Sequence, residues 1–535
     1  MFIRVKRSVH SQATYEYLQV VESFRDGGRP RQRVLTTLGR RDVLVANGML
    51  DDLLRSLAKF SEKLRVVKAV RSQGMHARRT RIWGPPLVFG RLWDEQGLPE
   101  VLRHLVKDRA FQFDVERACF AMALQRLCEP GSDLAGSKWL EHVEAPGVGD
   151  LQLQHFYRAC SFLADVREEL ERELFFKDRD LLSQELDLVF LDTTSTYVYR
   201  SQETEMCKRG YSRDRRPDQP QYVLCVAVDQ NAWPVAWEIY PGNTADKQAF
   251  EKIIGTLRAR FKIRRIIVVA DRGMISKNTI TLLTKHDDAP FKYILGCRMR
   301  KDLEVREEVL ARAGRFEEVA DNLEVKEVRV GRRRYIVCRN PEEALKDAAA
   351  RASMVEQLEK KLSHGAKQLI ANKGYRRFLK MARGSVTIDR DAIEYDARMD
   401  GKFVLRTNTN LSAKEVAETY KGLWRVERTF RKEKSTFEVR PIYHHRDDTT
   451  IGHIVASFLA LRLEMDLQLR LEKKNAKTPW AELMRDLSQV QAVDVELDGK
   501  RYLLRTDLIG SATAAFDAAG VRPPEPVTFL GPVKA

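Results

Sequence analysis

Apolar runs of strand length alternate with helical periodicity in the middle of the chain. The run Leu186–Leu191 is nearly continuous and ends in Asp192, and the β-branched run Ile266–Ala270 ends in Asp271. The pattern predicts these elements in chain order: strands at 186–191, 222–228 and 234–240, a helix at 245–260, a strand at 266–270, a helix from 276 and a strand at 293–296. This order indicates a mixed α/β sheet.

The N-terminal part of the chain has a different pattern. Residues 1–45 contain short β-leaning runs around a glycine turn, and residues 46–75 predict a helix. Residues 96–180 have helical periodicity, with these residues on one face: Val115, Cys119, Met122, Ala123 and Leu127. A helical DNA-reading module and an ordinary helical bundle both fit this second stretch.

Residues 298–398 interrupt the alternation of strand and helix patterns in the central region. A hairpin is predicted around Gly331, and Asn340 with the proline after it predicts a helix start. That helix is expected to run to about Leu362, and Val386–Tyr395 is expected to be a strand. The core pattern returns with a predicted strand at 400–406.

A long helix is predicted from the capping box Ser412–Glu415 through about Lys434. Residues spaced by three and four positions share one face of this helix: Tyr420, Trp424, Glu427, Arg431 and Lys434. An exposed face with a Glu427–Arg431 pair fits this spacing. A metal ligand beside a phosphate backbone fits it equally well.

Composition narrows the function classes. The chain has 535 residues, a net charge of +17 and a pI near 9.5. A polyanionic partner and ordinary solvated basic residues fit this charge about equally well. No apolar run approaches the ~18 residues that span a bilayer, and no signal peptide is expected. The 7 cysteines include no C-x-x-C pair, which excludes a disulfide scaffold and favours a reducing cytoplasm.

Three carboxylates are the main candidates for chemistry: Asp192, Asp271 and Glu427. Strand ends in α/β sheets are where sites are commonly built. Phosphodiester cleavage needs charge stabilisation at both the attacking and the leaving oxygen, and two Mg²⁺ ions can supply it. Mg²⁺ prefers hard oxygen ligands and keeps several waters, so a few carboxylates suffice.

The strand-Asp, strand-Asp, helix-Glu order resembles the DDE transposases, which have a ribonuclease-H-like fold. It is similar, more narrowly, to bacterial insertion-sequence transposases of the IS-four-like superfamily, whose glutamate lies in Tyr-x2-Arg-x3-Glu-x6-Lys. Tyr420, Glu427 and Lys434 match this spacing, whereas Leu423 stands at the Arg position. Four flanking motifs also match: Gly210–Asp218, Pro241–Thr244, Ala270–Met274 and Arg440–Pro441.

The resemblance implies a site and its partners. Asp192, Asp271 and Glu427 would be catalytic and would hold two Mg²⁺ ions, for which Mn²⁺ can substitute. The implied DNA-binding residues are Tyr420, Arg425, Arg431, Lys434, Arg213 and Arg272. The implied function is cut-and-paste transposition by a homodimer that binds terminal inverted repeats and target DNA, in the bacterial cytoplasm at the nucleoid. The alternatives are a catalytically silent DNA-binding protein derived from a transposase, and a ribonuclease-H-like nuclease without strand transfer.

The expected organisation is a ribonuclease-H-like catalytic core with an inserted α+β domain and a mainly helical N-terminal region. The expected divisions are these: a basic β unit plus helix at 1–95, a helical DNA-binding region at 96–185, the core at 186–297 and 399–470, the insertion at 298–398, and a C-terminal region at 471–535. Relatives use an insertion-domain tryptophan to handle a flipped base. This chain has no Trp between 238 and 423, which leaves Tyr335, Tyr375 or Phe378, or an insertion that works differently.

A second possible metal cluster consists of histidines near residue 450. His444, His445 and His453 could form one with Asp447 or Asp448. Hydrogen bonding at a loop and helix start is the favoured interpretation.

Overall fold

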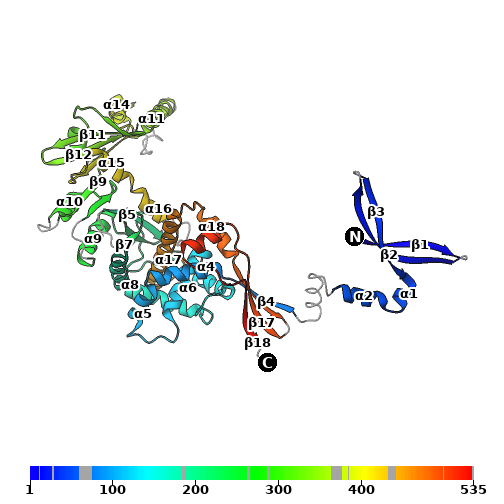
Figure 1. Cartoon of the computed structure of the whole chain (residues 1–535). Coiled ribbons are helices and arrows are strands. Elements are labelled where there is room, and N and C mark those ends of the chain that lie inside the picture. Colours follow the sequence, from blue (N-terminus) through cyan, green and yellow to red (C-terminus); the bar gives the residue numbers. More distant parts are fainter. Residues whose placement is uncertain are drawn as a thin grey trace. The chain divides into compact units, whose positions relative to one another are not determined.

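The computed structural model forms two compact units (Figure 1). The first contains residues 1–80, 491–507 and 524–535, and the second contains residues 81–490 and 508–523. The structure describes residues 1–10, 13–26, 29–58, 75–182, 188–261, 266–285, 290–362, 376–382, 385–431, 442–497 and 499–532.

The first unit contains two sheets. One consists of β1 (Phe2–His10), β2 (Ala13–Asp26) and β3 (Arg29–Arg40), which confirms the predicted N-terminal β unit. Helices α1 (Arg41–Ala46) and α2 (Met49–Ala58) follow, and residues 59–74 of the predicted helix lie outside the described residues. The second sheet has the order β18-β17-β16-β4, with these bounds: β4 (Met75–Ile82), β16 (Gln491–Leu497), β17 (Lys500–Arg505) and β18 (Val527–Pro532).

A nine-stranded mixed sheet forms the centre of the second unit, in the order β10-β11-β12-β15-β9-β8-β5-β6-β7. The strands predicted at its centre are all present: β5 (Leu188–Tyr197), β6 (Gln221–Val228), β7 (Pro234–Pro241), β8 (Ile267–Ala270) and β9 (Lys292–Gly296). β8 is parallel to both β5 and β9, while β6 is antiparallel to both β5 and β7. This mixed sheet is consistent with a ribonuclease-H-like core.

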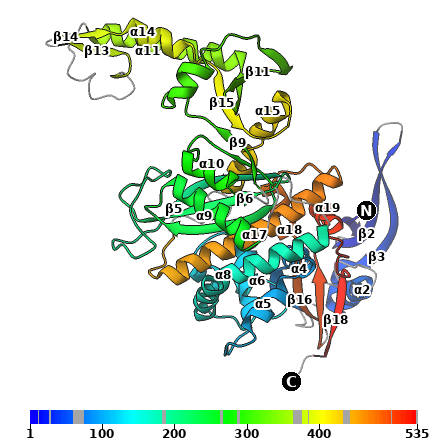
Figure 2. The same ribbon diagram turned by 90° about the vertical axis from the view of Figure 1, so that its left-hand side faces the viewer.

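Helices cover both faces of the sheet (Figure 2). On one face, α9 (Asp246–Ala259) packs on β5, β6 and β7, and α10 (Lys277–Thr284) packs on β9. The other face shares one hydrophobic core with α6 (Val115–Cys128), α8 (Leu153–Leu182) and α17 (Asp447–Lys473). The apolar face predicted on α6 is buried in that core, so the periodicity has a packing role, and DNA binding by this region stays a prediction.

The segment 298–398 contributes to the same sheet. Strands β10 (Glu317–Ala320), β11 (Leu323–Val330) and β12 (Arg333–Arg339) extend it next to β15 (Lys402–Thr407). The remaining elements of the segment are α11 (Pro341–Leu362), β13 (Leu379–Ala382), β14 (Ser385–Ile388) and α14 (Arg390–Ala397), with a π-helical turn at Val305–Val309. The Asn340 side chain accepts the Glu343 N–H at 3.1 Å, which confirms the predicted N-cap of α11.

Two predictions about local structure are wrong. The expected strand Val386–Tyr395 ends at Ile388, because Asp389 accepts the Ala392 N–H at 2.9 Å and starts α14. The expected long helix is two helices, α15 (Ala413–Lys421) and α16 (Trp424–Arg431). The backbone turns at Gly422, where a Cβ atom would lie 2.7 Å from the Phe190 ring.

The other helices complete the second unit: α4 (Gly84–Glu95), α5 (Leu98–Val106), α7 (Asp133–Trp139), a 3-10 turn (Leu140–His142), α18 (Trp480–Ser488) and α19 (Ala512–Ala518). Within the described ranges, we find no helix with the length and apolar character needed to cross a bilayer.

Candidate active site

Asp192 and Asp271 come together through strand pairing. Leu191 on β5 and Ala270 on β8 are register partners in a parallel pair, and each aspartate is the next residue. Adjacent strands lie about 4.8 Å apart, so the two aspartates start from neighbouring backbone positions. Asp192 was predicted to lie at the end of its strand, and this is wrong. Strand β5 continues to Tyr197 and pairs with β6 over that length.

The Asp192 carboxyl is buried beside charges of both signs. Burial raises the pKa of Asp192 to about 6, and the charges of Asp271 and Asp246 add to this effect. The Arg213 guanidinium and the Thr193 N–H, which donates to Asp192 at 2.7 Å, oppose it. Crowded carboxylates of this kind fit a divalent cation, which would relieve their mutual repulsion.

A third carboxylate, Asp246, belongs to this group and was not among the predicted site residues. It is the first residue of α9, and its Oδ1 accepts the Thr193 hydroxyl at 2.8 Å. Arg213 links the group: its Nη2 lies 2.9 Å from Asp246 Oδ1 and its Nη1 lies 3.7 Å from Asp192 Oδ1. Asp246 could have been recognised from the sequence as an acidic residue at a predicted helix start, two positions after the Pro241–Thr244 motif.

Tyr420 contacts the second aspartate directly. Its hydroxyl donates to Asp271 Oδ1 at 2.9 Å. Gly296, at the end of β9, leaves the space for this hydroxyl, because a Cβ atom there would overlap with it. Tyr420 was predicted to contact DNA; its observed partner is the Asp271 carboxylate, and the DNA contact stays a prediction.

Glu427 lies in the first turn of α16 and is exposed. Helix α16 packs on β5 and β6, and its Arg425 guanidinium lies 5.4 Å from the centre of the Phe190 ring. Phe190 and Asp192 are two positions apart on β5 and therefore point to the same face of the sheet. The helix of Glu427 thus covers the face on which Asp192 projects, and its approach to the metal position stays a prediction.

A basic pocket of about 460 Å³ opens beside Asp271. Its cationic lining was largely missed by the sequence analysis and consists of Arg272, Arg298, Arg300, Lys301 and Lys402. Arg298 donates to the backbone carbonyls of Arg272 and Gly273 at 2.9 and 2.8 Å and so fixes the turn after Asp271. The sequence feature that could have predicted this basic pocket is the run of basic residues directly after strand β9.

The remaining residues predicted to contact DNA differ in how exposed they are to solvent. Arg431 and Arg272 are exposed, and Lys434 lies outside the described residues. The Arg425 guanidinium lies 5.4 Å from the centre of the Phe190 ring and 5.1 Å from that of Trp424. Tyr335 and Phe378, considered for base handling, are each 1% exposed and belong to cores. Tyr375 lies outside the described residues.

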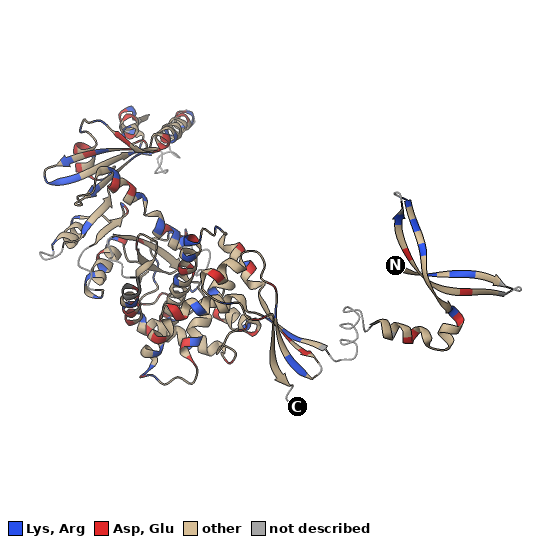
Figure 3. Ribbon diagram, in the orientation of Figure 1, with Lys and Arg blue, Asp and Glu red and all other residues tan. Residues whose placement is uncertain are grey.

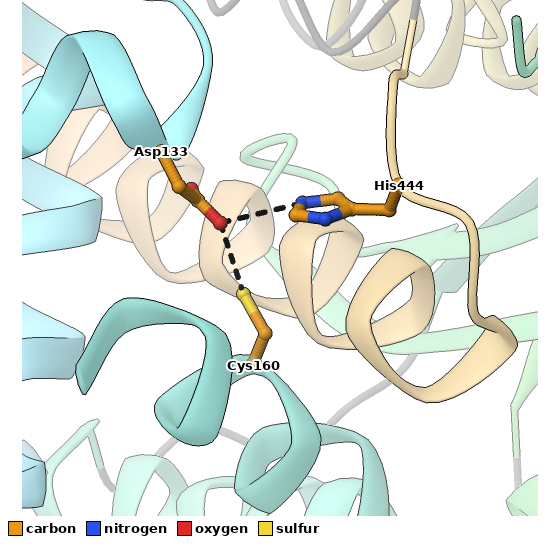
Figure 4. Close-up of side chains that lie close together, drawn as sticks. All are labelled: Asp133, Cys160 and His444. Atoms are coloured by element: carbon orange, nitrogen blue, oxygen red, sulfur yellow. Dashed lines mark hydrogen bonds and ion pairs between the residues drawn. The ribbon is translucent and has the colours of Figure 1, made fainter. Parts of the chain in front are cut away.

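At the start of α17, Asp447 and Asp448 are held by hydrogen bonds, as the favoured interpretation of the histidine-rich segment predicts. Asp447 accepts from Arg200, Thr204 and Tyr222 instead of facing a histidine. His444 instead faces Asp133 and Cys160, which come from two distant helices (Figure 4).

Comparison with known proteins gives two family matches. A model described as the transposase DDE domain matches residues 183–463, and a model of the N-terminal domain of IS1634 family transposases matches residues 3–71. A search of curated proteins found no match. Among solved structures, the chain has a match to a "Mos1 transposase paired-end complex with left transposon end" at 12% identity and a TM-score of 0.15, covering 39% of this chain and 76% of that one.

Proposed function

The chain belongs to the transposase DDE domain family, and on this premise we propose that it moves an insertion sequence by a cut-and-paste reaction. It would bind the terminal inverted repeats of its element, hydrolyse the phosphodiester at each end and join the freed 3′-hydroxyl to target DNA. The observation that supports this proposal most is the pairing of β5 with β8, which places Asp192 beside Asp271.

Two divalent cations, Mg²⁺ or Mn²⁺, fit the donors at this position. Asp192, Asp271 and Glu427 would hold them, since all three offer hard carboxylate oxygens. When bound, such ions activate water and stabilise charge on the attacking and leaving oxygens of an in-line displacement. Burial is the main cause of the raised pKa of Asp192; the charges of Asp271 and Asp246 add to it, and a bound cation would compensate those two charges.

The protein's own residues would position these groups. The Tyr420 hydroxyl, donating to Asp271, fixes the orientation of that carboxylate. Arg213 bridges Asp192, Thr193 and Asp246, and so fixes the other side of the site. The basic pocket beside Asp271 is suited to a phosphate group of the bound strand, because its arginines and lysines neutralise backbone charge.

DNA would be contacted on a wider surface. Arg272, Arg425, Arg431 and Lys434 would neutralise phosphates near the cut. Lys and Arg also follow the strands of the three-stranded sheet in the first unit (Figure 3). That sheet lies in the segment matched by the N-terminal domain model, and we assign to it the choice of terminal sequence. By resemblance, two copies of the chain would act on paired ends.

A joining assay tests the proposed function. The purified full chain is incubated with a supercoiled target plasmid, Mg²⁺ and labelled duplexes taken from the DNA that flanks its own gene. We expect the label in the plasmid with wild-type protein and with Asp150→Asn, an exposed aspartate used as the control. We expect none with Asp271→Asn. Cleavage without joining would indicate a nuclease, and binding without cleavage would indicate a silent DNA-binding protein.

A further inference from the structure

A second group of potential metal ligands lies within the second unit, on elements that carry none of the active-site acids. Asp133 is the first residue of α7, Cys160 lies in α8, and His444 lies in the segment that leads into α17 (Figure 4). Their donor atoms all lie within 4.8 Å of one another. Three separate segments of the chain therefore converge on one small volume.

The spacing of the donor atoms fits tetrahedral zinc. His444 Nε2 lies 3.3 Å from Asp133 Oδ2, and Cys160 Sγ lies 3.5 Å from the same oxygen. Zinc bonds are about 2.3 Å to sulfur and about 2.0–2.2 Å to nitrogen and oxygen. At tetrahedral angles these bond lengths place nitrogen and oxygen about 3.4 Å apart, and sulfur and oxygen about 3.6 Å apart. Both observed separations agree with these values.

The position of Asp133 also fits a cation. Its side chain is 1% exposed. Its Oδ1 atom faces Arg126 and His453, at 3.5 and 3.8 Å. Oδ2 is therefore the oxygen that an ion between His444 and Cys160 would contact.

Arg126 and His453 are adjacent but occupy the other side of this carboxylate. The nearest Arg126 nitrogen lies 3.5 Å from Oδ1, whereas His444 and Cys160 face Oδ2. Arg126 also approaches His453 Nδ1 at 2.8 Å, and since a guanidinium only donates, that nitrogen accepts. The carboxylate thus separates the arginine from the position between His444 and Cys160, and His453 supports Arg126 rather than completing the ligand set.

We propose that Asp133, Cys160 and His444 bind one Zn²⁺ ion. A cysteine, histidine and carboxylate set is typical of zinc and differs from the all-oxygen set at the active site. His444 also lines a pocket of about 560 Å³, from which a water would reach the ion as its fourth ligand. The ion would tie α7 and α8 to the segment that leads into α17.

Metal analysis of the purified full chain tests this proposal. Expression with zinc in the medium should give about one zinc ion per chain by mass spectrometry. His444→Ala should lower the zinc content at least about tenfold, whereas His445→Ala, an exposed neighbouring histidine, should retain it. Cys160→Ser should behave like His444→Ala, and Cys119→Ser, a buried cysteine of α6, like wild type.

Two further measurements make the result decisive. Cobalt substitution should give the visible spectrum of a tetrahedral site with a thiolate band, and Cys160→Ser should remove that band. Asp271→Asn should keep its zinc, so the test is independent of the proposed transposase chemistry. Wild-type protein that binds no zinc, or equal zinc in the His444 and His445 variants, would show that the three residues form only a hydrogen-bonded cluster. If circular dichroism shows that Cys160→Ser is unfolded, the comparison of zinc content between His444→Ala and His445→Ala tests the proposal.

Discussion

Gly296→Ala should slow DNA cleavage by displacing Tyr420 from Asp271. The new Cβ atom would overlap with the Tyr420 hydroxyl and would lie 3.0 Å from the backbone nitrogen of Arg272. The ring must therefore move, and its 2.9 Å hydrogen bond to Asp271 is lost. A hydrogen bond to a charged group contributes about 1.5–3 kcal/mol. At about 1.4 kcal/mol per tenfold change in rate, we expect cleavage to be about 10- to 150-fold slower.

Single-turnover cleavage in Mg²⁺ measures this effect, with binding followed separately by gel shift. Tyr420→Phe removes the same hydrogen bond without the added methyl group and should be slowed by a similar factor. The double variant should be little slower than either single variant, because both changes remove one interaction. Gly255→Ala is the matched control, since a Cβ atom there meets nothing within 4 Å.

Two results would refute this reasoning. Tyr420→Phe that cleaves at the wild-type rate would show that the hydroxyl does not position Asp271. A double variant whose loss equals the product of the two single losses would show that Gly296 acts through a different contact.

Three further predictions concern pH, packing and helix capping. Cleavage should increase as the pH rises through about 6, because Asp192 must be ionised to hold a cation and burial raises its pKa to about 6; Asp246→Asn should move the midpoint of the pH–rate profile to lower pH. Gly452→Ala should lower the free energy of unfolding by about 1–3 kcal/mol or more, measured in urea, because its Cβ atom would overlap with the Cys160 carbonyl where α17 crosses α8. Ser412→Ala removes the capping box of α15 and should cost about 1 kcal/mol, detected as faster amide exchange in that helix.

The central strands and two of the three candidate acids could be predicted from the sequence. Apolar runs that stop at Asp192 and Asp271 indicate buried strands, and the structure pairs these two strands side by side, although β5 continues beyond Asp192 to Tyr197. Asp246 and Arg213 could not be found in this way. Asp246 joins the site through contacts with residues more than thirty positions away, and no periodicity within its own segment encodes them.

The features that could not be predicted from the sequence have a common physical cause: each depends on contacts between distant segments. The helix break at Gly422 depends on contact with Phe190, and the placement of β10–β12 depends on pairing with β15 across the sheet. Similarly, the histidines near residue 450 could be recognised, but their partners Asp133 and Cys160 lie roughly three hundred positions earlier. Local sequence patterns predict most helices and strands, whereas contacts between distant segments determine where these elements break, which strands they pair with and which side chains they bring together.

The central claim is that Asp192, Asp271 and Glu427 form one metal-dependent cleavage site. The most direct measurement compares Mg²⁺-dependent nicking and gel-shift binding of terminal-repeat DNA for Asp192→Asn, Asp271→Asn and Glu427→Gln. Each amide keeps the shape of the side chain but removes the charge that holds a divalent cation. We predict that all three variants bind DNA about as well as wild type and do not nick it. Retained Mg²⁺-dependent nicking in any one variant would contradict the assignment of that residue to the site.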